Sequence, residues 1–214
     1  MNFQIFFDDV RNSLFGGKLS QGQVEGMENI INYRDQNYPD VSNDQLAYVL
    51  ATVKWETAHT MQPIKEYGST SYLKSKPYYP YYGRGLVQLT WKDNYAKYGL
   101  DKTPDKALEW PSALFVMFDG MTKGLFTGKK LADYINDSKR DYVNARRIIN
   151  GTDRAKEIAQ IADAYRTALI AAQDPVAPPA DDDLQSRFDE MLAIALTNNP
   201  RIQDLVRRLC AKKG

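Results

Sequence analysis

Apolar residues recur every three or four positions over most of the chain between residues 2 and 173, which is the period of an α-helix with one buried face. No stretch alternates apolar and polar residues as a half-buried strand would. The fold is therefore predicted to be mainly α. The expected helices cover residues 2–14, the segment from Ser20 toward Pro39, the segment from Ser42 to Glu56, and residues 104–110, 112–124, 131–135, 141–149 and 154–173.

Residues that start and stop helices mark the limits of these segments. Gly16–Gly17 and Pro39 end the first two, because glycine and proline disfavour continued helix. The predicted N-caps, whose side chains would accept a backbone amide hydrogen bond, are Ser20, Ser42 or Asn43, Thr90, Ser112, and Thr152 or Asp153. The third helix is predicted to bury one stripe, made of Leu46, Val49, Leu50 and Val53.

One glutamate lies just before the one long stretch without a period, and another lies inside it. Residues 57–82 are rich in Pro, Gly and Ser and predict a loop, which can carry functional groups when a rigid scaffold holds it. Glu66 lies in this loop, and Glu56 lies near the C-terminus of the helix before it. The helix dipole disfavours a negative charge at a C-terminus, which suits a carboxyl group that must donate a proton.

Composition and charge exclude several classes of function. The net charge is +1 and the chain has no phosphate-binding or dinucleotide-binding glycine motif, so a nucleic-acid partner is not expected. His59 and Cys210 are the single residues of their types, which nearly excludes a zinc hydrolase and excludes an internal disulfide. The first 17 residues carry Asp8 and Asp9 without a basic region, so we expect synthesis in the cytoplasm without a signal peptide.

The last 40 residues differ in composition from the rest. Residues 175–183 are rich in Pro and Asp and predict a linker between a domain over residues 1–174 and a small helical segment over residues 184–214. Residues 202–213 form a basic amphipathic pattern. A helical pair of this size buries little surface alone, so we expect it to dock on the main domain or to self-associate. Contact with an anionic membrane or outer surface, and disorder, are the alternatives.

One stretch, residues 81–95, concentrates groups that bind sugars. It begins YYGRGLVQLTW and offers Tyr and Trp rings with apolar faces, beside Arg, Gln, Thr and Asn hydrogen-bonding groups. Gly83 and Gly85 flank Arg84, so the backbone there can turn sharply and approach a ligand. The stretch reads as a short extended segment that leads into a helix beginning near Thr90.

Together with the upstream WETAH at residues 55–59, this stretch resembles the catalytic core of family 19 glycoside hydrolases, which include plant-type chitinases and many phage endolysins. A third patch, RRIING at residues 146–151, is similar to a later segment of that family. The resemblance covers roughly residues 42–172 and implies a lysozyme-like helical domain, here with a small C-terminal helical appendage. Trp55 replaces the family's usual His, and Thr152 stands where a second Gly is common.

The resemblance implies a catalytic set of Glu56, Glu66 and Thr90. Glu56 would be the general acid, and Thr90 would hold the nucleophilic water. Plant-type members place the second carboxylate further along, where this chain has no acidic residue between residues 67 and 82. Glu66 is therefore assigned as the general base, with a surface loop charge or an empty base position as the alternatives. An inverting enzyme needs such a pair on opposite faces of the sugar.

A further set of residues matches the family's binding positions. Gln88 and Asn94 would hydrogen-bond N-acetyl groups and sugar hydroxyls, and Tyr82 and Trp91 would line subsites, although Trp91 could equally belong to the core. Arg84 would anchor the cleft through a carboxylate, with Glu66 as one partner. The complete predicted binding set is Tyr82, Arg84, Gln88, Trp91, Asn94, Arg147 and Asn150, with a solvated helix face as the alternative for Arg147.

The sequence thus favours a monomeric endolysin-like enzyme that cleaves β-1,4 bonds between the N-acetylated sugars of peptidoglycan, with inversion. No metal or organic cofactor is expected, since two carboxylates suffice for the reaction. Without a signal peptide it would reach the cell wall after release or in a virion. The alternatives are a chitinase and a catalytically silent wall-binding or virion protein.

Overall fold

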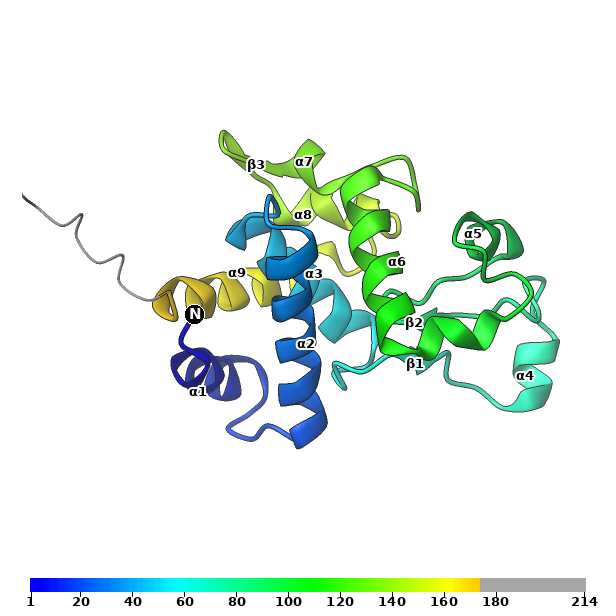
Figure 1. Ribbon diagram of the computed structural model, residues 1–214, viewed down its shortest axis with the longest axis horizontal. Coiled ribbons are helices and arrows are strands. Elements are labelled where there is room, and N and C mark those ends of the chain that lie inside the picture. Colours follow the sequence, from blue (N-terminus) through cyan, green and yellow to red (C-terminus); the bar gives the residue numbers. More distant parts are fainter. Residues whose placement is uncertain (174–214) are drawn as a thin grey trace, which may run out of the picture. The chain divides into compact units, whose positions relative to one another are not determined.

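Helices make up most of residues 1–173, the part of the chain that this computed structural model describes (Figure 1). The prediction of a mainly α fold is confirmed. The predicted linker at 175–183 and the predicted helical segment at 184–214 lie outside the described residues. The α-helices are α1 Phe3–Leu14, α2 Gln21–Asn37, α3 Asn43–Glu56, α4 Thr70–Lys74, α5 Lys92–Lys97, α6 Trp110–Lys123, α7 Leu131–Tyr134, α8 Tyr142–Ala145 and α9 Ala155–Ala171, with 3-10 helices η1 Pro104–Leu108 and η2 Arg146–Ile148.

Helix α3 lies at the centre of the fold. It packs mainly against α9, which also contacts α1 and α8. Every residue of α3 from Leu46 to Lys54 is buried, so the predicted single stripe is too narrow, because neighbouring elements cover the helix on all sides. Tyr165 of α9 closes the core, where its hydroxyl lies 3.6 Å from the sulfur atoms of both Met27 and Met61.

Side chains cap two of the helices that carry the core. The side chains of Ser20 and Ser42 each accept a hydrogen bond from the backbone of the residue three positions on, and the side chains of Gln23 and Gln45 accept one from the backbone amides of the two caps. These predicted caps are confirmed. The other predicted caps are wrong: α5, α6 and α9 follow Trp91, Glu109 and Arg154, without a side-chain cap bond at any of these three residues.

Two short antiparallel strand pairs interrupt the helices. Strand β1 Ile64–Lys65 pairs with β2 Arg84–Gly85, and β3 Ile135–Asn136 pairs with β4 Lys139–Arg140. Strands of two residues cannot show an alternating pattern, which explains why the sequence did not reveal them. The first pair joins the loop that carries Glu66 to the 81–95 stretch, and the backbone amide of Glu66 donates to the carbonyl of Gly83 at 2.7 Å.

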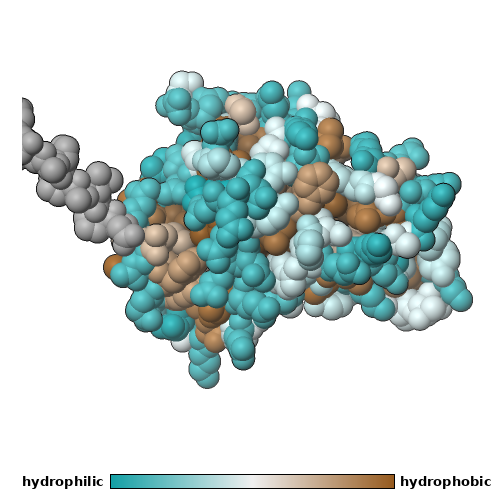
Figure 2. Space-filling model, viewed as in Figure 1, coloured by the Kyte–Doolittle hydropathy of each residue, from teal (hydrophilic) through white to brown (hydrophobic). Residues whose placement is uncertain are grey.

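The described chain has a helical body and a smaller lobe. The body contains α1, α2, α3 and α9, and the lobe contains β1, β2, α4 and α5 (Figure 1). The face shown in Figure 2 is largely hydrophilic, with smaller hydrophobic areas. Within residues 1–173, none of the helices combines the length and the apolar character needed to cross a bilayer.

Candidate active site

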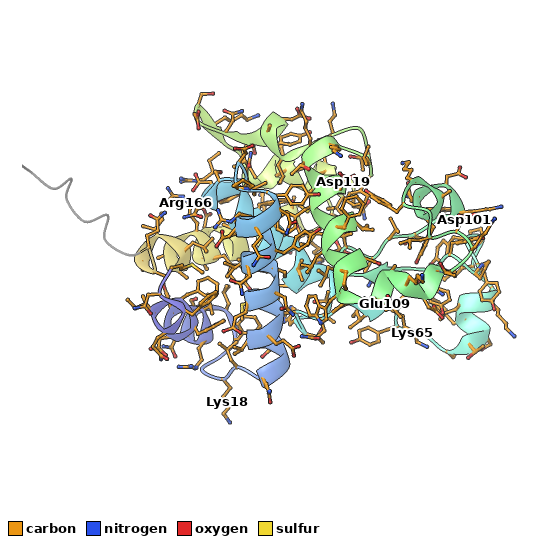
Figure 3. All side chains as sticks on the ribbon, in the orientation of Figure 1. Lys18, Lys65, Asp101, Glu109, Asp119 and Arg166 are labelled. Carbon is orange, nitrogen blue, oxygen red and sulfur yellow. The ribbon has the colours of Figure 1, made fainter. Side chains whose placement is uncertain are left out.

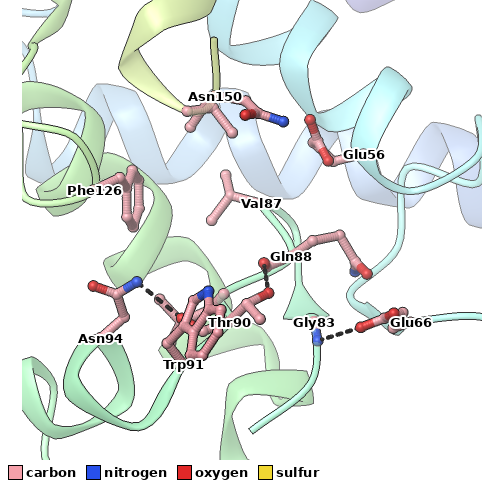
Figure 4. Close-up of a pocket in the computed structure, with 12 residues that line it drawn as sticks. Glu56, Glu66, Gly83, Val87, Gln88, Thr90, Trp91, Asn94, Phe126 and Asn150 are labelled. Carbon is pink, nitrogen blue, oxygen red and sulfur yellow. Dashed lines mark hydrogen bonds between the residues drawn. The ribbon is translucent and has the colours of Figure 1, made fainter. Parts of the chain in front are cut away.

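A cleft of about 570 Å³ gathers most of the residues predicted from the sequence (Figure 4). This volume lies within the usual range for small-molecule sites. The predicted residues that line it are Glu56, Glu66, Gln88, Thr90, Trp91, Asn94 and Asn150. Gly83, which was expected to let the backbone approach a ligand, also lines it, and the lining residues without a predicted role are Val87, Leu89, Phe126 and Ile149. The cleft is thus built from the end of α3, the loop after it, the 83–94 stretch and the turn after η2.

Glu56 forms an ion pair with an arginine that the sequence analysis did not choose. The Oε1 atom of Glu56 lies 2.5 Å from Nη1 of Arg146, and the two side chains are 16% and 5% exposed. Arg146 also donates from Nε to the carbonyl of Asp153 at 3.2 Å. Arg147, the predicted neighbour, is exposed and does not line the cleft. The irregular η2 turn decides which of the two arginines faces inward.

Glu66 is held by two donors. Its Oε1 atom accepts a hydrogen bond from the Tyr78 hydroxyl at 2.8 Å, and its Oε2 atom accepts one from the Gly83 amide at 3.0 Å. Burial, together with the hydrogen bond to Glu66, raises the pKa of the Tyr78 phenol to about 12, so Tyr78 keeps its proton at neutral pH. Both contacts fix the orientation of the Glu66 carboxylate, whose remaining lone pairs can still accept a proton.

The backbone of the cleft stretch is strained at two residues. Gln88 has φ 53° and Trp91 has φ 74°, in a region that residues with a Cβ atom rarely adopt. The side-chain amide of Gln88 donates to the backbone carbonyls of Ile64 and Gly85, and these bonds stabilise the conformation of Gln88. Trp91 is 52% exposed, so its alternative assignment to the core is wrong. Strain of this kind is concentrated at functional sites in proteins.

Thr90 and Asn94 form a short hydrogen-bonded series in the cleft wall. The Thr90 hydroxyl donates to the carbonyl of Gln88 at 2.8 Å, and the Asn94 amide donates to the carbonyl of Thr90 at 2.8 Å (Figure 4). The Thr90 hydroxyl proton is therefore engaged, and its lone pairs remain for a donor in the cleft. The side chain of Thr90 serves this contact instead of the predicted helix cap.

Arg84 and Tyr82 do not line the cleft. Arg84 is 3% exposed, and its Nε atom contacts Asp105 at 2.8 Å. The predicted pair of Arg84 with Glu66 is therefore wrong. The Tyr82 ring lies 3.7 Å from the Arg84 guanidinium, and the Tyr95 hydroxyl accepts a further bond from it. Arg84 and Tyr95 are buried, Tyr82 is half-buried and Asp105 is exposed, so the cluster holds Arg84 inside the 81–95 stretch. The sequence did not indicate Asp105, because it lies on η1, a separate element.

Asn150 lies on the opposite wall from the 83–94 stretch. Its Oδ1 atom accepts a hydrogen bond from the Gly151 amide at 2.8 Å, and Figure 4 shows its amide nitrogen directed toward Glu56. The exposed amide group can therefore donate to a ligand next to that carboxylate.

Comparison with known proteins gives a distant structural likeness. No protein-family model matches the chain, and no curated protein matches its sequence. A crystal structure of a chitinase C mutant is similar with a TM-score of 0.46 and 18% sequence identity, over 83% of this chain and 95% of that one. The assignment of function therefore depends on the side chains that line the cleft.

Proposed function

We propose that this protein is a glycoside hydrolase that cleaves β-1,4 bonds between N-acetylated sugars of peptidoglycan, with inversion at the anomeric carbon. One observation carries the proposal: Glu56 and Glu66 come from different elements and line the same cleft, with amide, hydroxyl and indole groups beside them. Paired carboxylates in a polar cleft with an exposed aromatic ring are the equipment that glycoside hydrolysis requires.

Glu56 takes the part of general acid in this proposal. It donates a proton to the glycosidic oxygen while the bond from that oxygen to the anomeric carbon breaks. Arg146 contacts the same carboxyl group and holds it in position at the end of α3. The Asn150 amide lies on the same side and can bind the sugar whose oxygen leaves.

Glu66 and Thr90 handle the water. Because the Thr90 hydroxyl already donates to a carbonyl, it can only accept a hydrogen bond from the water. The water then gives its other proton to Glu66, and its oxygen forms the new bond to the anomeric carbon. Tyr78 and the Gly83 amide hold Glu66 in place throughout.

The decisive test is mass spectrometry of soluble fragments released from purified, protein-free peptidoglycan by the wild type and by Glu56→Gln. We expect fragments with reducing N-acetylmuramic acid ends from the wild type and none from the variant. Reducing N-acetylglucosamine ends would show that the other glycosidic bond is cleaved. Anhydro ends would show that the enzyme is a transglycosylase and not a hydrolase. If the wild type releases nothing, the peptidoglycan proposal is wrong, and chitin oligomers then separate a chitinase from a binding protein.

Glu66→Gln tests the base separately. We expect the rate to fall by roughly 10²–10⁴-fold, the usual contribution of a general base. Tyr78→Phe removes one of the two bonds that orient Glu66 and should cost much less. A Glu66→Gln variant that retains the wild-type rate would exclude Glu66 as the base.

A further inference from the structure

An ammonium group is held on an aromatic ring outside the cleft. The Nζ atom of Lys76 lies 4.1 Å from the centroid of the Tyr72 ring, a cation–π contact that limits the positions the flexible lysine can take. The Tyr72 ring also packs on Gly68, where an added Cβ atom would come within 2.5 Å of the ring. Both neighbours keep Tyr72, and with it the charge of Lys76, in one place.

The turn that carries Lys76 leads toward the cleft. Tyr78, which donates to Glu66, meets the exposed ring of Trp91 edge-on at a centroid distance of 5.5 Å. Lys76 precedes Tyr78 by two residues, and the backbone amide of Tyr79 donates to the carbonyl of Lys76 at 3.0 Å, so one turn carries both Lys76 and the residue that donates to Glu66.

The charges along this segment are not balanced by carboxylates. Residues 63–82 contain Lys65, Lys74 and Lys76 against Glu66 alone, whose oxygens already accept hydrogen bonds. Among the described residues, none of these three lysines forms an ion pair. Figure 3 shows Lys65 in the smaller lobe, far from Lys18 at the other end of the body. An anionic polymer that leaves the cleft on this side would meet uncompensated positive charge.

We propose that Lys76, positioned by Tyr72, is an anion subsite that continues the cleft and binds carboxylate groups of peptidoglycan strands. The inference rests on the proposed function and narrows its substrate class. Peptidoglycan carries lactyl-linked peptides with free carboxylates, whereas chitin is uncharged. Because the ring restricts Lys76 before binding, less side-chain entropy is lost when a carboxylate arrives.

The test compares binding of Glu56→Gln and of Glu56→Gln with Lys76→Gln to insoluble peptidoglycan, before and after its carboxyl groups are amidated. We expect Lys76→Gln to weaken binding to native peptidoglycan about threefold, the size of an exposed ionic contact, and to leave binding to amidated peptidoglycan unchanged. Lys18→Gln removes the same charge elsewhere and should change neither. Lys76→Arg should restore most of the affinity.

Each remaining outcome decides a separate question. Equal binding of the Lys76→Gln and Lys18→Gln variants would overturn the subsite, as would a loss that persists on amidated peptidoglycan. The binding assay uses the Glu56→Gln background and does not depend on turnover, so its result is independent of the fragment analysis. A wild type that releases no fragments would overturn the hydrolase proposal while the Lys76 effect could still be measured.

Discussion

At the scale of single residues, the ion pair between Glu56 and Arg146 connects two parts of the chain that lie 90 positions apart. Arg146 is almost fully buried and spans from α3 to the loop at Asp153. We expect Arg146→Met to lower kcat on the order of 10²-fold with a smaller effect on KM, because Arg146 positions Glu56, the proposed general acid, and displacement of such a group costs about this much. Steady-state kinetics on peptidoglycan fragments would measure the change.

Arg147→Met provides the control for that experiment. It removes the same charge one residue later, from an exposed side chain that does not line the cleft. We expect activity within about twofold of the wild type, as for most surface substitutions. Equal losses in the two variants would mean that net charge, and not the position of Glu56, matters.

Trp91 supplies a second prediction for a single residue. Its φ of 74° and ψ of 139° suit glycine, so replacing the indole separates side-chain binding from backbone strain. We expect the free energy of unfolding of Trp91→Gly to be about 1 kcal/mol higher than that of Trp91→Ala. Both variants should bind substrate weakly, because both lack the indole. Urea denaturation measures the difference.

Ser75 is the matched position for this comparison, because it is exposed and has an ordinary φ of −78°. There the order should reverse, with Ser75→Ala more stable than Ser75→Gly, since glycine gains more freedom in the unfolded chain. If alanine is also the better residue at position 91, the backbone there is not strained.

Among the elements, α2 depends on a close approach to the loop after α3. A Cβ atom added at Gly26 would lie 2.0 Å from the backbone oxygen of Met61, which cannot move without moving the loop. We expect Gly26→Ala to destabilise the protein by about 2–3 kcal/mol, although alanine normally favours a helix. Thermal unfolding would show this as a lowered Tm.

Gly22 of the same helix gives the opposite expectation. A Cβ atom there would meet the side chain of Gln62 at 3.6 Å, an ordinary contact. Gly22→Ala should therefore raise the free energy of unfolding by about 0.5–1 kcal/mol. A similar loss in Gly22→Ala and Gly26→Ala would show that helix α2 does not pack on Met61 as closely as described.

The short helix α8 leads into the turn that carries Arg146, and Asp141 caps it. Asp141 accepts hydrogen bonds from the backbone and side chain of Asn144, which lower its pKa. Because the folded pKa lies below the unfolded one, this stabilisation is complete above the unfolded value and is lost as the pH falls through the folded value. Asp141→Ala should cost about 1 kcal/mol at neutral pH and little in strong acid.

Asp141→Asn separates the cap from the charge. Asparagine caps helices about as well as aspartate, so stability at neutral pH should be close to that of the wild type. The part of the acid sensitivity that belongs to position 141 should disappear. Urea titrations at several pH values measure both variants, and a cost of Asp141→Ala that persists in strong acid would contradict the role of the carboxylate.

For the whole molecule, the sequence predicted most of the helices and much of the cleft wall, because both depend on local patterns, but it missed the five-residue helix α4, which lies in the segment predicted as a loop. Periodicity placed the helices, and the linear motif placed Thr90, Trp91 and Asn94 together. Arg146 and Tyr78 were missed because their contacts depend on an irregular turn and on a loop without a period. For a single chain without aligned relatives, long-range partners of this kind have no local signal.

The ends of the described fold meet on one side of the body. The backbone amide of Asn2 donates to the carbonyl of Ala172 at 2.8 Å, so the main chain almost closes into a ring. Domains with adjacent ends tolerate circular permutation. A rearranged gene that joins residue 172 to residue 2 through a short glycine linker, and opens the chain at the exposed β3–β4 turn around Asp137, should therefore encode a protein with the same cleft.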